Sequence, residues 1–151
     1  MKHATAIRVG LFTLAGLQTM VSVWQYFFPR SFYDDFPTVS LDPPYNEHLL
    51  TDVGGLGLAL TAMLYFAAVV LDRKVVLSAV LGYTIYAASH FAFHVRHFEH
   101  FSLRDALGVG TGLGLEVVLA LALLAGTLVP PRREVQPGSA QPAERSLKGE
   151  R

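Results

Sequence analysis

Four apolar segments in this chain predict an all-α fold, a bundle of four transmembrane helices. The segments are residues 9–28, 53–71, 75–95 and 106–129. Each has about the 20 residues that an α-helix needs to cross the hydrocarbon layer of a bilayer. The composition agrees, because 52% of the 151 residues are hydrophobic and only 16% are charged. Four such helices in a soluble protein would have almost no polar face to present to water.

The first segment has a second interpretation, a cleaved signal peptide, because Lys2 and Arg8 precede its apolar run. The run is long, however, and it ends in the bulky residues 24–28 without a small-residue cleavage site after them. We therefore predict a retained helix, with Trp24 and Tyr26 placed as an aromatic anchor at the membrane interface.

The connections divide the chain into one membrane domain and a tail. Residues 72–74 form a link so short that the second and third helices must be antiparallel neighbours. Residues 29–46 are the one long connection, and their mixture of aromatic and acidic residues is typical of a loop that folds back over the bundle. Residues 1–129 are predicted to form the transmembrane domain. Residues 130–151 are rich in proline, glycine and charge, and are predicted to be a disordered cytoplasmic tail.

The cationic residues predict the orientation of the helices. Most of them flank one side of the four segments: Lys2, Arg8, Arg73, Lys74, Arg132 and Arg133. The other side carries only Arg30, Arg96 and Arg104. Because cytoplasmic connections are enriched in Lys and Arg, we expect both termini in the cytoplasm and a multi-pass protein of the plasma membrane.

Charge and cysteine content exclude several classes of function. The formal net charge is +0, which gives no reason to expect nucleic acid as a partner. The absence of cysteine excludes disulfides, thiolate metal sites and thiol catalysis. Redox chemistry in this chain would therefore need a bound cofactor.

The histidines on the predicted outer side form the first candidate site. His90, His94 and His97 share one face of the third helix, and His100 follows them. The second helix opens opposite them, so one hypothesis is a transition-metal site composed of Glu47, His48, His90, His94 and His97. A haem held by His48 with His90 or His94 is an alternative. Hydrogen-bonded histidines with a structural or proton-handling role account for the pattern more simply than either.

Glu116 is the second candidate, because it lies near the middle of the fourth segment. An ionised carboxylate at that depth is costly, so we expect Glu116 to face the bundle and to be protonated at neutral pH. Gln18 in the first helix and Tyr83, Thr84 or Tyr86 in the third lie at similar depth as hydrogen-bond partners. The group either holds helices together or forms a ligand or proton site with Gln18, Tyr86 and Asp52.

Glycines open the fourth helix in two small-xxx-small pairs, Gly108 with Gly112 and Gly110 with Gly114. Such pairs let helices approach closely in lipid, so they predict a contact with a second copy or with a membrane-complex partner. We expect the matching surface within the chain to be Gly54, Gly55 and Gly57 of the second helix. A ligand cavity between the two glycine faces is the alternative.

The layout resembles that of the DoxX-like group of small bacterial membrane proteins. The resemblance covers the four helices and includes the opening Arg8-Val9-Gly10, Gly16, and the long connection before a glycine-rich second helix. Some members are subunits associated with quinone-linked sulfur oxidation, so the resemblance implies a bacterial origin and contact with a quinone. Residues 44–54 and the histidine series indicate a subgroup with a site of its own.

The function that this sequence predicts is that of an accessory or ligand-binding membrane subunit with a pocket rich in His and carboxylates on its outer face. Such a pocket would be linked to a quinone or a metal. A membrane metalloenzyme or haem protein and a purely structural subunit are the two alternatives. The sequence leaves open whether the protein is an enzyme.

Overall fold

The computed structural model describes residues 2–41 and 44–129, and these residues form helices and turns without a strand. Four helices are long and apolar enough to cross a membrane: α1 (Lys2–Phe27), α3 (Glu47–Val70), α4 (Arg73–Val95) and α5 (Leu103–Leu128). The predicted all-α fold with four long apolar helices is therefore confirmed. The predicted tail, residues 130–151, lies outside the described residues, as do Arg132 and Arg133.

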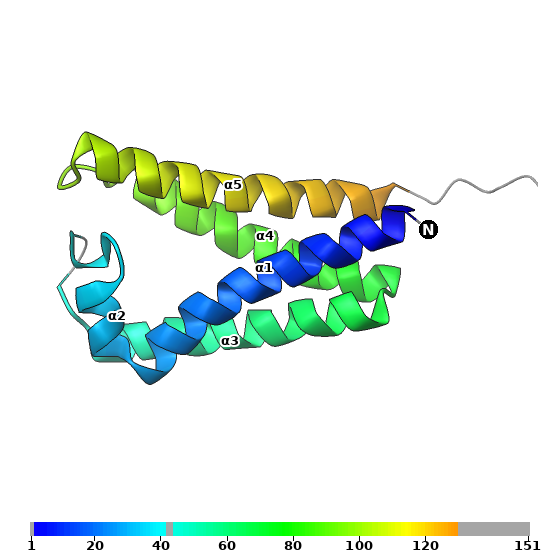
Figure 1. Ribbon diagram of the computed structural model, residues 1–151, viewed down its shortest axis with the longest axis horizontal. Helices are drawn as coiled ribbons and strands as arrows, with labels where there is room; N and C mark the ends of the chain where they lie inside the picture. Colours follow the sequence, from blue (N-terminus) through cyan, green and yellow to red (C-terminus); the bar gives the residue numbers. More distant parts are fainter. Residues whose placement is uncertain (1, 42–43, 130–151) are drawn as a thin grey trace, which may run out of the picture.

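The four long helices run in alternating directions along one axis (Figure 1). The N-terminus of α1, the tight turn between α3 and α4, and the end of α5 lie at one end, which we call the terminal end. The other end, which we call the loop end, carries residues 28–41, 44–46 and 96–102. The α1 helix begins earlier than the apolar segment predicts, at Lys2, so it extends beyond that segment at the terminal end.

The helices pack as two pairs, α1 with α3 and α4 with α5. The pairs meet near the terminal end and diverge toward the loop end (Figure 1). The predicted contact of α3 with α4 is present, but α1 is the main partner of α3. Leucine, alanine and valine side chains fill the core between the pairs, among them Leu11, Leu14, Leu64, Ala67, Val80 and Leu123.

Two glycines explain why α3 follows α1. A Cβ atom on Gly54 would lie 2.7 Å from the backbone nitrogen of Tyr26, and one on Gly57 would lie 2.7 Å from Gln18 Nε2. Only glycine permits this approach of the two backbones. The expectation that these glycines match those of the fourth helix is wrong, because they face α1 instead. In α5, Gly110 and Gly114 face Phe98 and Phe91, respectively. A Cβ atom on Gly108 or Gly112 would meet nothing within 4 Å.

Side chains cap the starts of three of the long helices. Asn46 Oδ1 accepts a hydrogen bond from Leu49 N at 3.0 Å, and Ser102 Oγ accepts one from Asp105 N at 3.2 Å. Asp72 caps α4 by accepting from Lys74 N at 2.9 Å. These caps satisfy N–H groups that have no partner within their own helix.

The long connection contains secondary structure that the sequence analysis did not predict. It begins with the short helix α2 (Pro29–Asp35) and continues with the 3-10 turn η1 (Val39–Leu41). Pro29 stands at the first position of α2, where its missing N–H costs nothing. The buried ring of Phe32 packs edge-on against Trp24 of α1, with the ring centroids 6.0 Å apart. The connection therefore folds back onto α1 and α3 at the loop end, as predicted.

Candidate functional site

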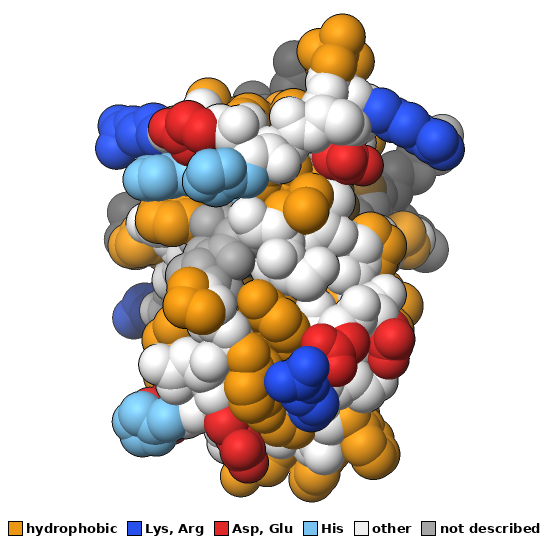
Figure 2. All heavy atoms as spheres, turned by 90° about the vertical axis from the view of Figure 1, so that its left-hand side faces the viewer, with side chains coloured by type: hydrophobic (Ala, Val, Ile, Leu, Met, Phe, Trp, Pro, Cys, Tyr) orange, Lys and Arg blue, Asp and Glu red, His pale blue; other side chains and the backbone are white. Residues whose placement is uncertain are grey.

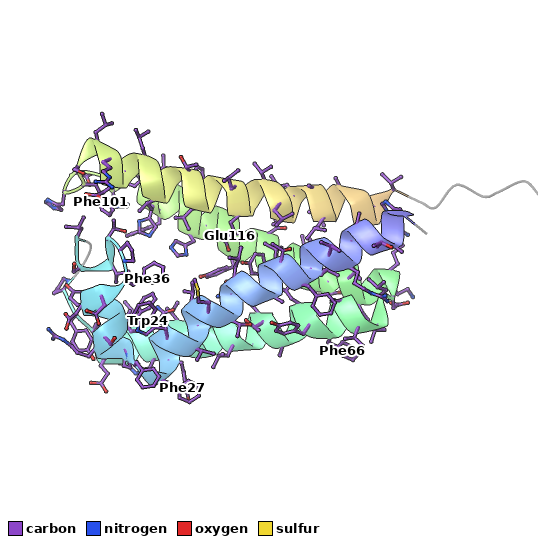
Figure 3. The ribbon with its side chains drawn as sticks, viewed as in Figure 1. Trp24, Phe27, Phe36, Phe66, Phe101 and Glu116 are labelled. Carbon is purple, nitrogen blue, oxygen red and sulfur yellow. The ribbon has the colours of Figure 1, made fainter. Side chains whose placement is uncertain are left out.

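Glu116 joins three helices at mid-length of the bundle. Its half-buried carboxylate accepts a hydrogen bond from the hydroxyl of Tyr83, which is 0% exposed. The same hydroxyl lies 3.2 Å from Gln18 Oε1, and the Gln18 amide donates to Ser22 Oγ at 2.9 Å. Figure 3 shows Glu116 on the side of α5 that faces α1. We call Gln18, Ser22, Tyr83 and Glu116 the central cluster.

The packing of α1 on α3 explains how this polar group is tolerated. Gln18 and Ser22 lie one turn apart on the face of α1 that contacts Gly57 of α3. Because glycine has no side chain, it leaves room there for the hydrogen bond between Gln18 and Ser22. Gln18 is 5% exposed and Ser22 is 0% exposed. Both are hydrogen-bonded, which removes most of the cost of burying a polar group.

Sequence reasoning named Glu116, Gln18 and Tyr86 as one site, and the structure places Tyr83 at its centre. Tyr86 also contacts Gln18, but its hydroxyl lies 3.3 Å from His90 Nδ1 on the other side. The sequence analysis considered Tyr83 and Tyr86 as equivalent partners for Glu116, and it missed Ser22. The signal for Ser22 was its spacing of four residues from Gln18, which puts both side chains on one helix face.

Two histidines of α4 extend the polar groups toward the loop end. His90 Nε2 lies 3.1 Å from His94 Nε2, and the two rings stack with centroids 4.9 Å apart. Phe101, at the start of α5, packs edge-on against His94. Trp24 of α1 and Phe36, which follows α2, lie at the same end of the bundle (Figure 3). The aromatic neighbours of the two histidines are therefore Tyr86, Phe93 and Phe101, all from α4 or the start of α5.

The remaining residues of the predicted metal site lie elsewhere. His97 donates from Nδ1 to the carbonyl oxygen of Phe93 at 2.7 Å and is exposed. His48 pairs with Asp52 at 3.3 Å on the exposed surface of α3. Glu47 is also exposed and lies beside Tyr45, whose pKa is raised by desolvation and by the negative charge of Glu47.

Consequently the five predicted metal ligands do not converge. Within residues 2–41 and 44–129, no three His, Asp or Glu side chains are grouped so that they could hold a metal ion. Figure 2 views the loop end and shows histidines at two separate places, on the side of α4 and α5 and on the side of α2 and α3. The expectation of a shared pocket assumed that α3 and α4 stay adjacent along their length, whereas they diverge toward the loop end (Figure 1). Asp52 does not reach the central cluster either, because it lies on the exposed surface of α3 and pairs with His48.

Cationic side chains at the terminal end bind carbonyl oxygens at the ends of helices. Arg73 donates from Nε to Thr127 O at 3.0 Å and from Nη2 to Leu128 O at 3.1 Å. Arg8 donates to Ala68 O of α3 at 3.1 Å. These bonds satisfy carbonyl groups in the last turns of α3 and α5, where the helix dipole is negative. The cations at the terminal end therefore have a structural role. The polar groups that could take part in chemistry, the central cluster and the histidines of α4, lie at mid-length and toward the loop end.

Comparison of the chain with protein-family models, curated protein sequences and solved structures finds no match. The function is therefore argued from the central cluster itself.

Proposed function

We propose that this chain is an accessory or ligand-binding subunit of a bacterial plasma membrane, and that its ligand binds at the central cluster. In this proposal both termini are cytoplasmic, because Arg8, Arg73 and Lys74 lie at the terminal end. The loop end then faces outward, and the polar groups occupy the outer half of the membrane. The resemblance to DoxX-like proteins agrees with this placement.

The observation that carries the proposal is the half-buried carboxyl group of Glu116 beside Tyr83 and Gln18. Acidic side chains are rare in membrane helices and mark ligand or proton sites when they occur. Within a few ångströms the cluster offers a carboxyl group, a phenol and an amide, which can both donate and accept hydrogen bonds. A structural hydrogen bond between two helices would need only two of these groups.

The surroundings favour a ligand that dissolves in the membrane. The α1 and α5 helices are in contact near the terminal end, where a Cβ atom on Gly10 would meet Leu123, and they diverge toward the loop end (Figure 1). Glu116 is half-buried, so the helices do not enclose its carboxyl group completely. A quinone combines an apolar body with two carbonyl oxygens that accept hydrogen bonds, so it fits this site. The carboxyl group of Glu116 and the hydroxyl of Tyr83 would donate to one such oxygen.

The single tryptophan provides the test. Trp24 lies on α1 beyond Ser22, and quinones quench indole fluorescence at short range. Titration of the detergent-solubilised protein with a short-chain ubiquinone and a short-chain menaquinone should quench Trp24 in a saturable way. Glu116→Leu and Tyr83→Phe should each weaken binding by about tenfold, the effect of one net hydrogen bond of about 1.4 kcal/mol. Glu99→Gln, an exposed acid in the connection between α4 and α5, should leave it unchanged.

Two other results would replace the proposal. Linear, non-saturable quenching that Glu116→Leu does not alter would favour the purely structural subunit. A transition metal or a haem spectrum in the purified protein, present in stoichiometric amount and lost in His94→Ala, would favour the metal-linked or haem-linked alternative.

A further inference from the structure

Three side chains of α4 form a line from the central cluster to the loop end. Tyr86, His90 and His94 are spaced four residues apart, which places each one a turn above the last on the same helix face. The Tyr86 hydroxyl lies 3.3 Å from His90 Nδ1, and His90 Nε2 lies 3.1 Å from His94 Nε2. All three are half-buried. The line therefore runs inside the bundle, along the direction of the membrane normal.

Both ring nitrogens of His90 have a hydrogen-bond partner, so the hydrogen bonds along the line can point in either of two directions. A neutral imidazole has one donor and one acceptor nitrogen. In one arrangement Tyr86 donates to His90 Nδ1, and His90 Nε2–H donates to His94 Nε2. In the other arrangement His94 Nε2–H donates to His90 Nε2, and His90 Nδ1–H donates to the Tyr86 oxygen. The same atomic positions accommodate both directions, so the change needs no rotation of either ring.

We infer that Tyr86, His90 and His94 are a proton path between the aqueous phase at the loop end and Glu116. The inference rests on the proposed function, since it gives the ligand site a route for proton exchange. His94 Nδ1 is buried, so a proton from the loop end reaches it only when the helices open there. Its arrival is matched by transfer of the Nε2 proton to His90 and of the His90 Nδ1 proton to Tyr86. The Tyr86 hydroxyl proton then passes to the ionised carboxylate of Glu116, a step that one bridging water would complete. One proton enters, one reaches Glu116, and no group is oxidised or reduced.

The location of the line supports a path more than a purely structural role. A structural histidine needs one hydrogen bond to its own helix, as His97 has through Nδ1 to Phe93 O. His90 instead bonds to titratable groups on both sides, and the series ends next to Tyr83 and Glu116. Chains of titratable groups within membrane helices are the usual structural basis of proton transfer in pumps and transporters.

The test measures how fast the Glu116 carboxyl group exchanges its proton with solvent. Protein reconstituted in lipid is transferred from H₂O to D₂O, and infrared spectra follow the shift of the protonated carboxyl C=O band. The band is assigned to Glu116 by its loss in Glu116→Gln. In His90→Phe the exchange should slow by about a hundredfold, the lower end of what a positioned proton-transfer group contributes. His94→Ala and Tyr86→Phe should slow it similarly.

A matched control and a rescue separate the path from an effect on folding. His97→Phe removes a histidine near the same helix end that lies off the line, and it should not change the rate. Free imidazole added to His94→Ala should restore exchange, because it replaces the missing proton carrier but not a packing contact. Each variant must keep the helical circular dichroism and the gel-filtration volume of the wild type. If a variant does not, His90→Asn, which retains one donor and one acceptor on a smaller side chain, replaces His90→Phe.

The outcomes are distinct from those of the ligand titration. Equal exchange rates in wild type, His90→Phe and His94→Ala would overturn the path, even if quinone binding is normal. Absence of a carboxyl band that Glu116→Gln removes, at every pH where the protein stays folded, would also overturn it. Slowed exchange with imidazole rescue, but without saturable quenching of Trp24, would retain the path and refute the quinone as ligand.

Discussion

The hydroxyl of Tyr83 on α4 donates to the carboxylate of Glu116 on α5, and this bond holds the only acidic side chain within residues 53–71, 75–95 and 106–129. Gln18 of α1 lies 3.2 Å from the same hydroxyl. A hydroxyl has one hydrogen, so Tyr83 can donate to only one of the two acceptors at a time. Protonation of Glu116 would therefore release the Tyr83 hydrogen toward Gln18. The protonation state of Glu116 therefore decides which of the two acceptors receives the Tyr83 hydrogen.

We predict that Glu116→Gln leaves the free energy of unfolding nearly unchanged, because glutamine keeps the size and the hydrogen-bonding capacity of the acid. Glu116→Leu should lower it by about 1 kcal/mol, the typical value of a hydrogen bond between membrane helices. Unfolding in mixed detergent micelles with increasing dodecyl sulfate measures both. In a double-mutant cycle, Glu116→Leu and Tyr83→Phe should be non-additive, since both remove the same bond. Additive losses would contradict this assignment.

Gly57→Ala should lower the free energy of unfolding by about 1–3 kcal/mol, because the new methyl group overlaps Ser22 and approaches Gln18 Nε2. The matched control is Gly16→Ala on α1, where a Cβ atom meets nothing within 4 Å. Adding Ser22→Ala to Gly57→Ala should recover part of the loss, since it removes the overlapping hydroxyl. The same unfolding assay applies, and equal stabilities of Gly57→Ala and Gly16→Ala would show that α1 and α3 are less closely packed than the structure indicates.

Arg73→Gln should destabilise the terminal end by about 1–2 kcal/mol, because it removes two charge-assisted hydrogen bonds to Thr127 O and Leu128 O. Lys74→Gln is the matched control, since Lys74 is the adjacent exposed cation. Hydrogen exchange followed by mass spectrometry should show faster exchange in the last turn of α5 for Arg73→Gln alone. Protection that is identical in the two variants would mean that the last turn of α5 does not depend on Arg73.

The orientation is tested with reporter fusions. Reporters fused after Lys74 and after Arg133 should be active only in the cytoplasm, and those fused near Asp42 only outside, because the cations are concentrated at the terminal end. A reporter that is active outside the cytoplasm when fused after Lys74 would show the opposite orientation, in which the proton path opens to the cytoplasm. Substituting Arg30 and Arg104 at the loop end should not alter the result.

The sequence by itself determined the number of long helices and their approximate positions in the chain. In a membrane every backbone polar group must be satisfied within its own segment, so a run of about 20 apolar residues has no alternative to a helix. Asn46, Asp72 and Ser102 supply the acceptors that start α3, α4 and α5. The same argument placed Glu116 inside the bundle, because a carboxyl group facing lipid would be too costly.

Only the tertiary structure decided which of these residues meet. Pairing in lipid depends on which helix surfaces fit, since apolar burial favours no particular rotation when the solvent is itself apolar. Gly54 and Gly57 bring α3 against α1, and this pairing moves His48 and Asp52 away from the histidines of α4. The rotation of α4 places Tyr83 on Glu116 and directs Tyr86 toward both Gln18 and His90. These contacts depend on sub-ångström fit between helices distant in sequence, and no local pattern of residues records that fit.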